Sequence, residues 1–588
     1  MTVEDPASTV VNADGTVTFN YRNDLAKEVM VDVQFAGRHS MERDSVSGLW
    51  TVTLGPAAPD MYPYCFVVDG VSIMDPKCSQ WFPNEGFKNS LLDIPGSDAP
   101  LIHSIQPVAH GDVEYVTYYS ETIKAYSNAL VYLPPSYAAS DKSYPVFYLI
   151  SGTTDTEEVY YKVGRMNYIL DNLIAQGEAK EMIVVLPYGN PMKLVGSTDM
   201  LGSNDLFSED LVGSLMPYVE SHYRTANDRE NRAIGGFSRG GNQALMNGLM
   251  NLDKFSYLCS YSSFTSTELP KVYDNAKATN SKINLFWTGV GTDDFLYGTA
   301  RDYTEFLDRK GIRCVKEYTD DKFGHTWMNA KYFLAKTMRL LFNPEASAEA
   351  MKNAQPTKAK TGNEQQFTPG VMARLFPRPI VSPEFTTDGV TFRFKAPSAE
   401  CVMLDGEMLN GPHKMERDSD GVWSVTLTDV TPDVYCYNFV VDDLQVVDPQ
   451  NMYLAPDRGF KRSVLNMPDA PFSVNNARLN YSPVAYKAET TANGESRFYA
   501  TVSPLGIDAT SLPVVALVAG GNDTFESWYK IAHANLILDQ MMAEGKCKPC
   551  VLYLVEQPMA NAAVQLVSSD YMTWSDARKA LVEALSNL

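Results

Sequence analysis

An internal repeat constrains the fold of this 588-residue chain more than any other feature of its sequence. Residues 415–427 repeat residues 41–54 with few changes, and residues 439–443 repeat residues 66–70. The spacing between the copies is nearly constant, which is typical of a duplicated module rather than of chance similarity. Any fold proposed for the first copy must therefore also suit the second.

The duplicated module is predicted to be a β-sandwich. Residues 15–21 and 29–35 alternate apolar and polar side chains with a period of two, as a half-buried strand does. Further short segments of this kind follow, with turn residues between them, and this spacing is typical of a sandwich. We therefore expect one sandwich over residues 1–98 and a second over residues 371–470.

Between the two copies, residues 99–346 change to an α/β pattern. The fully apolar runs 146–150 and 182–187 alternate with helical segments such as 166–174. Such alternation indicates a buried, mostly parallel sheet covered by helices. Residues 347–370 are rich in Ala, Lys, Gln, Thr and Pro and have no apolar period, so we interpret them as a linker.

Within the α/β region, Gly236-Phe-Ser238-Arg-Gly240 has the Gly-x-Ser-x-Gly pattern of a nucleophile elbow. At so sharp a turn between a strand and a helix, side chains two positions before and after the serine would collide with neighbouring backbone. The preceding residues are typical of the end of a strand, and residues 242–250 are typical of a helix. Ser238 is therefore the candidate nucleophile.

A serine nucleophile needs a base and an acid that orients the base, and in α/β-hydrolases these follow the serine as acid and then histidine. The histidines after Ser238 are His325, His413 and His533, and the last two lie in repeated modules. His325 is therefore the candidate base. The acid should follow the strand after the elbow, where the residues alone leave Asp293 and Asp294 as alternatives.

An oxyanion hole needs two backbone N–H groups aimed at the reacting carbonyl oxygen. We expect one from Arg239, directly after the nucleophile, and one from the loop after residues 146–150, where Thr153 is the best candidate. Five aromatic side chains could line a substrate slot, and most of them could equally belong to the core: Phe207, Tyr160, Tyr161, Phe264 and Trp327. Trp81 lies in a predicted loop, where it could stack on sugar, overhang the site or simply anchor the loop.

The repeat continues beyond the second sandwich. Residues 514–520 match 146–152, and residues 534–541 resemble 166–173. We align the last helix, 575–588, with the helix around 210–222, which precedes the elbow. Residues 471–588 are thus expected to be a partial, nucleophile-free α/β domain, either a degenerate copy or a cut through a second one.

Taken together, these motifs resemble carbohydrate esterase family 1, the esterase-D-like group that holds feruloyl esterases and acetyl xylan esterases. The matching pieces are residues 132–137, 236–241, 291–296 and 324–327. The resemblance implies an α/β-hydrolase domain in which Ser238, Asp294 and His325 form the triad. It also implies that the sandwiches are immunoglobulin-like, early-set modules similar to CBM48. This chain departs from the family at Ser151-Gly152, where the family usually has His-Gly. The oxyanion donor in this loop therefore cannot be assigned from the family pattern alone.

The resemblance implies a serine esterase that removes acyl groups from plant cell-wall polysaccharide, with feruloylated arabinoxylan the expected substrate and acetylated xylan the alternative. No metal or cofactor is required. The alternative from another class is a non-catalytic glycan-binding protein. Oligomeric state is left open. A secreted or periplasmic location is expected, with the leader peptide removed. Residues 1–6 lack the basic start and apolar core of a signal peptide, so the sequence itself leaves the compartment open.

Composition argues against nucleic-acid binding and against a membrane span. The formal net charge is −22, which argues against binding a nucleic-acid backbone, because that needs clustered cations. No run of 18 apolar residues is present, so no membrane span is expected. The eight cysteines are sparse, and Cys547-Lys-Pro-Cys550 has no second ligand pair, so we interpret them as structural thiols.

Overall fold

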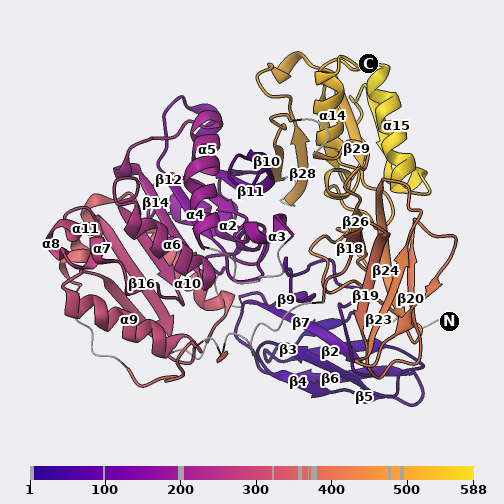
Figure 1. Cartoon of the computed structure of the whole chain (residues 1–588), viewed down its shortest axis with the longest axis horizontal. Helices are drawn as coiled ribbons and strands as arrows, with labels where there is room; N and C mark the ends of the chain where they lie inside the picture. Colours follow the sequence, from indigo (N-terminus) through magenta and orange to yellow (C-terminus); the bar gives the residue numbers. More distant parts are fainter. Residues whose placement is uncertain are drawn as a thin grey trace. The chain divides into compact units, whose positions relative to one another are not determined.

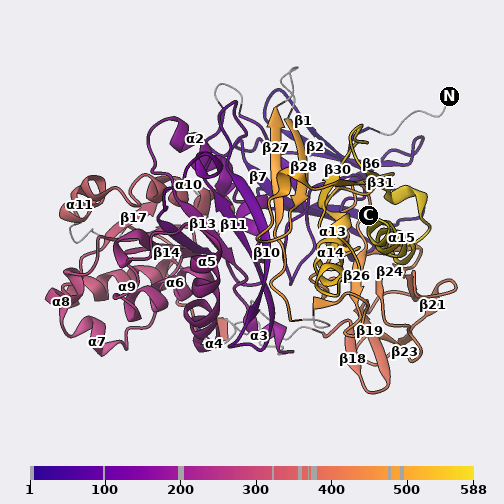
Figure 2. The same cartoon turned by 90° about the horizontal axis from the view of Figure 1, so that it is seen from above.

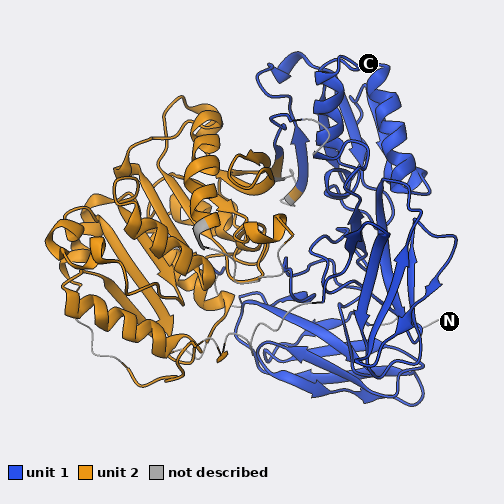
Figure 3. Cartoon of the chain, viewed as in Figure 1, with its two compact units in different colours: residues 1–101, 379–484, 498–588 blue, residues 102–378, 485–497 orange. Residues whose placement is uncertain are grey.

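The computed structural model describes most of the chain. The described residues are 6–96, 100–196, 204–320, 324–354, 360–368, 370–371, 380–474, 478–490 and 496–588. They divide into two compact units (Figure 3). Unit 1 contains residues 1–101, 379–484 and 498–588, and unit 2 contains residues 102–378 and 485–497. All eight cysteines are free thiols.

The first module in unit 1 is a β-sandwich of two antiparallel sheets (Figure 1). One sheet has the order β1-β2-β6-β5, and the other has the order β4-β3-β7-β8 with β9 also paired to β7. The inner faces meet through aromatic rings, with Phe19 and Tyr64 at 5.5 Å between centroids and Tyr21 and Phe66 at 4.8 Å. The strands are β1 (Thr9–Val11), β2 (Val17–Arg22), β3 (Val29–Val33), β4 (Gly37–Ser40), β5 (Glu42–Arg43), β6 (Leu49–Leu54), β7 (Met61–Val68), β8 (Val71–Ile73) and β9 (Ser90–Asp93).

The second module repeats this sandwich strand by strand, as the internal repeat predicts. Its sheets have the orders β18-β19-β23-β22 and β21-β20-β24-β25, with β26 paired to β24. Even the buried polar centre is repeated: Tyr64 donates a hydrogen bond to Asp75, and Tyr437 donates one to Asp448. The strands are β18 (Glu384–Thr386), β19 (Gly389–Lys395), β20 (Val402–Gly406), β21 (His413–Lys414), β22 (Glu416–Arg417), β23 (Val422–Leu427), β24 (Val434–Val441), β25 (Leu444–Val446) and β26 (Ser463–Asn466).

Unit 2 is built on a mixed sheet with the order β17-β16-β15-β14-β12-β13-β11-β10-β27. The strands from β12 to β17 run parallel to one another, and β11 runs antiparallel to β13. These parallel strands are mostly buried because helices cover both faces of the sheet. The strands are β10 (Asp112–Ser120), β11 (Ala125–Leu133), β12 (Val146–Ile150), β13 (Ile183–Pro187), β14 (Arg232–Phe237), β15 (Tyr257–Tyr261), β16 (Leu285–Gly291), β17 (Val315–Thr319) and β27 (Val484–Thr490).

The helices of unit 2 lie on the two faces of this sheet (Figure 2). One face carries α2 (Met166–Ala175), α10 (Trp327–Met338) and α11 (Pro344–Lys352). The other carries α5 (Met216–His222), α6 (Arg239–Met250) and α9 (Tyr297–Lys310). The shorter helices are α1 (Val159–Lys162), α3 (Pro191–Leu194), α4 (Asn204–Asp210), α7 (Pro270–Tyr273) and α8 (Ala276–Asn280). This is the doubly covered sheet that the alternating pattern predicts.

The last part of unit 1 repeats the first half of this α/β fold. Its sheet has the order β28-β30-β29-β31. The elements are β28 (Ser496–Val502), β29 (Val514–Val518), α13 (Ser527–Lys530), α14 (Ala534–Ala543), β30 (Val551–Val555), β31 (Val564–Val567) and α15 (Trp574–Ser586). Strand β29 pairs with β30 in the same parallel register in which β12 pairs with β13.

The register of β31 corrects our alignment of the last helix. β31 runs parallel to β29 on the side away from β30, which is the place of β14 beside β12. Val515 pairs with Val564 where Phe147 pairs with Ala233. Counting onward from those pairs places Ser569 at the position of Ser238. Helix α15 therefore corresponds to α6, not to the helix around 210–222, and the copy extends past the elbow position. The sequence did not reveal this correspondence, because β31 is short and mixes apolar and polar residues without a clear period.

The structure of the predicted linker also differs from the expectation. Its first residues belong to α11, which ends at Lys352. Residues 360–367 are not a free connection but contact the loop before α9 and α9 itself, as described below. Their polar composition fits these contacts as well as it fits a linker, so composition could not separate the two. Within the part of the chain that the structure describes, no helix is both long and apolar enough for a bilayer crossing.

Candidate active site

Ser238 lies at the turn between β14 and α6, with φ 57° and ψ −121°. Non-glycine residues rarely adopt positive φ, and such strain persists only where the surroundings impose it. A Cβ at Gly240 would lie 2.1 Å from the Ile150 carbonyl oxygen, and one at Gly236 would lie 2.4 Å from the Gly240 backbone. Both glycines of the motif are therefore required by the close approach of strand, turn and helix.

His325 connects the serine to a carboxylate. Its Nε2 lies 2.9 Å from Ser238 Oγ, and its Nδ1 lies 2.9 and 3.0 Å from the two carboxylate oxygens of Asp294. The Asp294 carboxylate is fully buried, whereas the imidazole retains 18% of its surface exposed. The geometry thus holds a tautomer with the proton on Nδ1, which leaves Nε2 free to accept the proton of the serine hydroxyl.

The structure distinguishes between the two adjacent acids that the residues alone left open. Asp293 is exposed, while Asp294 points into the domain toward His325. The backbone N–H of Leu296 donates to Asp294 Oδ1 at 2.8 Å, and that of Tyr297 donates to the Asp294 carbonyl at 2.9 Å. The first turn of α9 therefore fixes the carboxylate in place.

The predicted oxyanion donors belong to segments next to the nucleophile. Arg239 is the first residue of α6, so its backbone N–H belongs to the turn that directly follows Ser238. A Cβ on Gly152 would lie 3.5 Å from Ser238 Cβ, which puts the loop of Thr153 beside the serine. The N–H of Gly152 itself is donated to Asp155 Oδ2 at 3.1 Å. The roles of Arg239 and Thr153 stay predictions.

Four of the aromatic residues predicted to bind substrate lie in different surroundings. Trp327 and Phe207 are 6% and 1% exposed, and Trp327 packs against Phe237 at 5.2 Å between ring centroids. Phe264 is half-buried after β15. Trp81 belongs to unit 1, where it packs on the apolar cluster of Met74, Val447 and Leu454. Contact of these residues with substrate stays a prediction.

Sequence reasoning missed two further aromatic neighbours of the histidine. Phe295 lies over His325 with 4.4 Å between ring centroids, and Phe237 stacks on it at 4.7 Å. Both were visible in the sequence, since Phe295 directly follows Asp294 and Phe237 directly precedes Ser238. The imidazole thus contacts two aromatic rings, and their packing restricts its rotation.

Comparisons with known proteins agree with this geometry. A family model described as a putative esterase matches residues 120–326, a range that includes the serine, the acid and the histidine. An endo-1,4-β-xylanase/feruloyl esterase of Xylanibacter ruminicola is 31% identical over 340 residues, which are 56% of this chain and 45% of that protein. Endo-1,4-β-xylanase Y of Acetivibrio thermocellus is 28% identical over 196 residues, 30% of this chain and 17% of that protein. The chain thus spans less than half of the length of these two curated relatives.

Among solved structures, a ferulic acid esterase of Anaeromyces mucronatus is 24% identical, with a TM-score of 0.34, and the match covers 41% of this chain and 94% of that one. The family match and the hydrogen-bonded serine, histidine and aspartate lead to the same conclusion. Residues 120–326 are similar to a family of putative esterases, and they hold a serine, a histidine and an aspartate in the hydrogen-bonded arrangement of a serine hydrolase.

Proposed function

We propose that Ser238, His325 and Asp294 hydrolyse acyl esters of xylan-type polysaccharide, with ferulate as the preferred acyl group. The observation that carries the proposal is the continuous hydrogen-bond chain from Ser238 Oγ through the imidazole to the buried Asp294 carboxylate. The choice of a xylan-type substrate is supported by the relative from Xylanibacter ruminicola, whose name combines a xylanase with a feruloyl esterase.

In the proposed reaction, Ser238 Oγ attacks the ester carbonyl carbon while His325 Nε2 takes the hydroxyl proton. The negative charge that develops on the carbonyl oxygen is stabilised by the N–H groups of Arg239 and Thr153. The imidazolium then gives its proton to the oxygen of the departing sugar alcohol, which leaves the acyl group on Ser238.

Water completes the cycle. His325 takes a proton from a water molecule as that water attacks the acyl-serine carbonyl, and the same proton returns to Ser238 Oγ when the acid is released. Asp294 remains ionised throughout, keeps the imidazole in its reactive orientation and stabilises its positive form. Phe237 and Phe295, which contact the imidazole, help to hold that orientation.

The preference for ferulate over acetate is supported by the rings around the site. Ferulate is planar and aromatic, so a slot that binds it needs aromatic or apolar surface beside the serine. Phe295 and Phe264 are only half-buried and lie on the loops after β16 and β15, the strands that follow the elbow. An acetyl group needs no such surface.

The test is release of free acid from methyl ferulate and from acetylated xylan, with Ser238→Ala as the control. We expect ferulate release by the native chain and a fall in kcat of on the order of 10⁴ or more in the variant, as in other triad enzymes. Acetate release alone would change the acyl group and keep the mechanism. Turnover by Ser238→Ala close to that of the native chain would overturn the assignment.

A further inference from the structure

Residues 360–367, which we call the strap, are anchored to unit 2 at their first residue. Lys360 Nζ donates to the Tyr318 carbonyl at 2.8 Å and forms an ion pair with Asp320 at 2.6 Å. The Tyr297 hydroxyl donates to the carbonyl of Lys360. The strap therefore begins against the end of β17 and the first residue of α9, and it lies outside the range matched by the esterase family model.

The middle of the strap contacts the loop that holds the catalytic acid. The N–H of Asn363 donates to the carbonyl of Thr292 at 2.7 Å, and Thr292 precedes Asp294 by two residues. A Cβ on Gly362 would lie 2.6 Å from the same carbonyl oxygen, so only glycine permits this approach. The strap thus lies directly on the acid loop.

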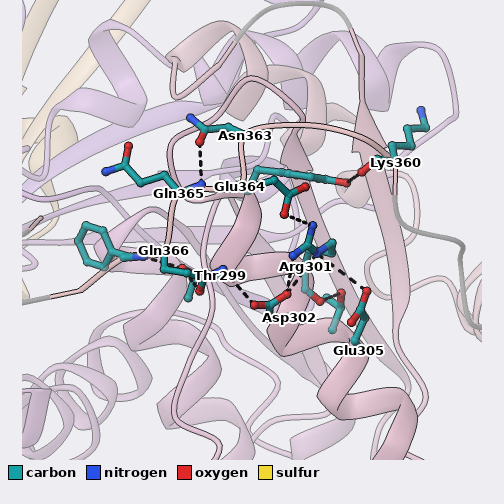
Figure 4. A network of polar contacts seen from close by, with 12 residues as sticks. Thr299, Arg301, Asp302, Glu305, Lys360, Asn363, Glu364, Gln365 and Gln366 are labelled. Carbon is teal, nitrogen blue, oxygen red and sulfur yellow. Dashed lines mark hydrogen bonds and ion pairs between the residues drawn. The ribbon is translucent and has the colours of Figure 1, made fainter.

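A charged network fixes the second half of the strap on α9 (Figure 4). Arg301 pairs with Glu364 of the strap at 2.5 Å and with Asp302 at 2.8 Å. The hydrogen bond to Glu364, and then that to Asp302, raises the pKa of the guanidinium above its ordinary value. Gln366 Nε2 donates to Asp302 at 3.0 Å. These contacts hold the segment in one position relative to the helix that follows Asp294.

The strap ends by placing a phenyl ring among those of the active site. The N–H of Phe367 donates to Thr299 Oγ1 at 2.8 Å. Its ring lies 6.1 Å from that of Phe295 and 6.0 Å from that of Phe264, between ring centroids. Phe295 in turn lies 4.4 Å from His325. All three phenylalanines are half-buried, so each retains exposed apolar surface.

We propose that Phe264, Phe295 and Phe367 form the subsite for the aromatic acyl group and that the strap is the specificity-determining segment that completes it. The inference rests on the proposed function, since it concerns the acyl group that Ser238 receives. Phe295 and Phe264 come from the esterase fold, whereas Phe367 is added by a segment outside the family match. An aromatic acid in contact with these rings gains stacking and burial that an acetyl group cannot.

The test compares two esters with the same leaving group, 4-nitrophenyl ferulate and 4-nitrophenyl acetate, on the full chain. In Phe367→Ala we expect kcat/KM for the ferulate ester to fall about tenfold, because one ring of the subsite is lost. The acetate ester should change by less than about twofold, since its acyl group does not reach the ring. Phe367→Leu, which keeps the side chain apolar and of similar size, should give an intermediate loss and guards against misfolding of the alanine variant.

Phe306→Ala is the matched control. Phe306 is also half-buried in unit 2 and pairs with Tyr273, not with the three rings of the subsite. The ratio of the two kcat/KM values should be the same in this variant as in the native chain. An equal fall with both esters in Phe367→Ala would reduce the strap to a support for the acid loop and overturn the subsite, as would an unchanged ratio in both Phe367 variants.

These outcomes differ from a failure of the proposed function. If the native chain cleaved neither ester, or if Ser238→Ala cleaved both at the native rate, the triad assignment would fail, whatever Phe367 does. If the native chain cleaved both esters through Ser238 but Phe367 did not change their ratio, the triad would stand and only the subsite would fail.

Discussion

The chain forms the same pair of parallel strands twice, and only one copy leads into the proposed nucleophile, Ser238. In unit 2, β14 runs parallel to β12 and leads through Ser238 directly into α6. In unit 1, β31 runs parallel to β29 in the same register and leads through Ser569 toward α15. The shared register means that strand pairing alone does not create the elbow.

The turn residues account for the difference. At the positions of Gly236 and Gly240, the second copy has Val567 and Tyr571. Ser569 lies in a short 3-10 turn, Ser568–Asp570, rather than in the positive-φ conformation of Ser238. Side chains larger than hydrogen prevent the close approach that exposes a serine between strand and helix. The second copy therefore has the same strand pairing but not the sharp turn that exposes a serine.

The loop opposite the turn has changed with it. In unit 2 the N–H of Gly152 donates directly to Asp155. In unit 1 the N–H of Gly520 donates to Ser568 Oγ at 2.9 Å, and that hydroxyl donates to Asp523 at 2.6 Å. The Ser568 hydroxyl thus lies between the Gly520 N–H and the Asp523 carboxylate, which in unit 2 have counterparts that bond directly.

The largest effect is expected from adding one methyl group to the working elbow. In Gly240→Ala the new Cβ would lie 2.1 Å from the Ile150 carbonyl oxygen, so α6 and its N–H groups must move away from the site. We expect ester hydrolysis to fall by on the order of 10³, the cost of losing an oxyanion donor. The measurement is kcat/KM with 4-nitrophenyl acetate, together with circular dichroism to verify folding.

The matched change in the other copy is Tyr571→Ala, at the position equivalent to Gly240. It should leave kcat/KM within about twofold, because unit 1 contributes no residue to the triad. Nearly native activity in Gly240→Ala, or a large loss in Tyr571→Ala, would contradict the view that glycines at the turn separate the two copies.

A smaller effect, on stability, is expected from the residue that directly precedes α2 in one copy and α14 in the other. Arg165 before α2 and His533 before α14 both adopt positive φ, at 46° and 56°. His533 is buried, and burial lowers its pKa to about 4, with the charge of Arg578 contributing. Because the unfolded chain takes up a proton near pH 6.5 and the folded chain does not, this histidine contributes stability that is complete above pH 6.5 and is lost toward pH 4.

In His533→Gln that dependence should disappear. Between pH 7 and pH 4.5 the free energy of unfolding of the native chain should fall relative to that of the variant, by on the order of 2 kcal/mol. Urea denaturation of both proteins at the two pH values measures the difference, so that the buried carboxylates common to both cancel. A difference that stays constant with pH would mean that His533 binds a proton as readily in the folded protein as in the unfolded one.

Much of the fold and of the triad could be predicted because the signals are local or periodic. The repeat, the period-two strands and the apolar runs predict the sandwiches and the parallel sheet, and Ser238 and His325 follow from motif and chain order. The choice between Asp293 and Asp294 needs the direction of each side chain, which adjacent residues in a loop do not reveal. The structure resolves it through the first turn of α9.

Other features depend on contacts between segments far apart in the chain. The strap has the composition of a linker, and only its pairing with α9, Arg301 with Glu364 above all, identifies it as part of unit 2. The position of β31 depends on strand register, which its four residues do not specify. Phe367 was therefore missed, and α15 was aligned with the wrong helix.

Labelling with diisopropyl fluorophosphate tests the central claim most directly, because the reagent phosphorylates serines that a neighbouring base activates, with release of fluoride. The full chain would be treated and digested, and the peptides that contain Ser238 and Ser569 compared by mass spectrometry. We predict one adduct per chain, on Ser238, with loss of ester hydrolysis, and no adduct on Ser569 although that residue is exposed. An adduct on Ser569, or full hydrolysis with Ser238 labelled, would contradict the assignment of the active site to unit 2.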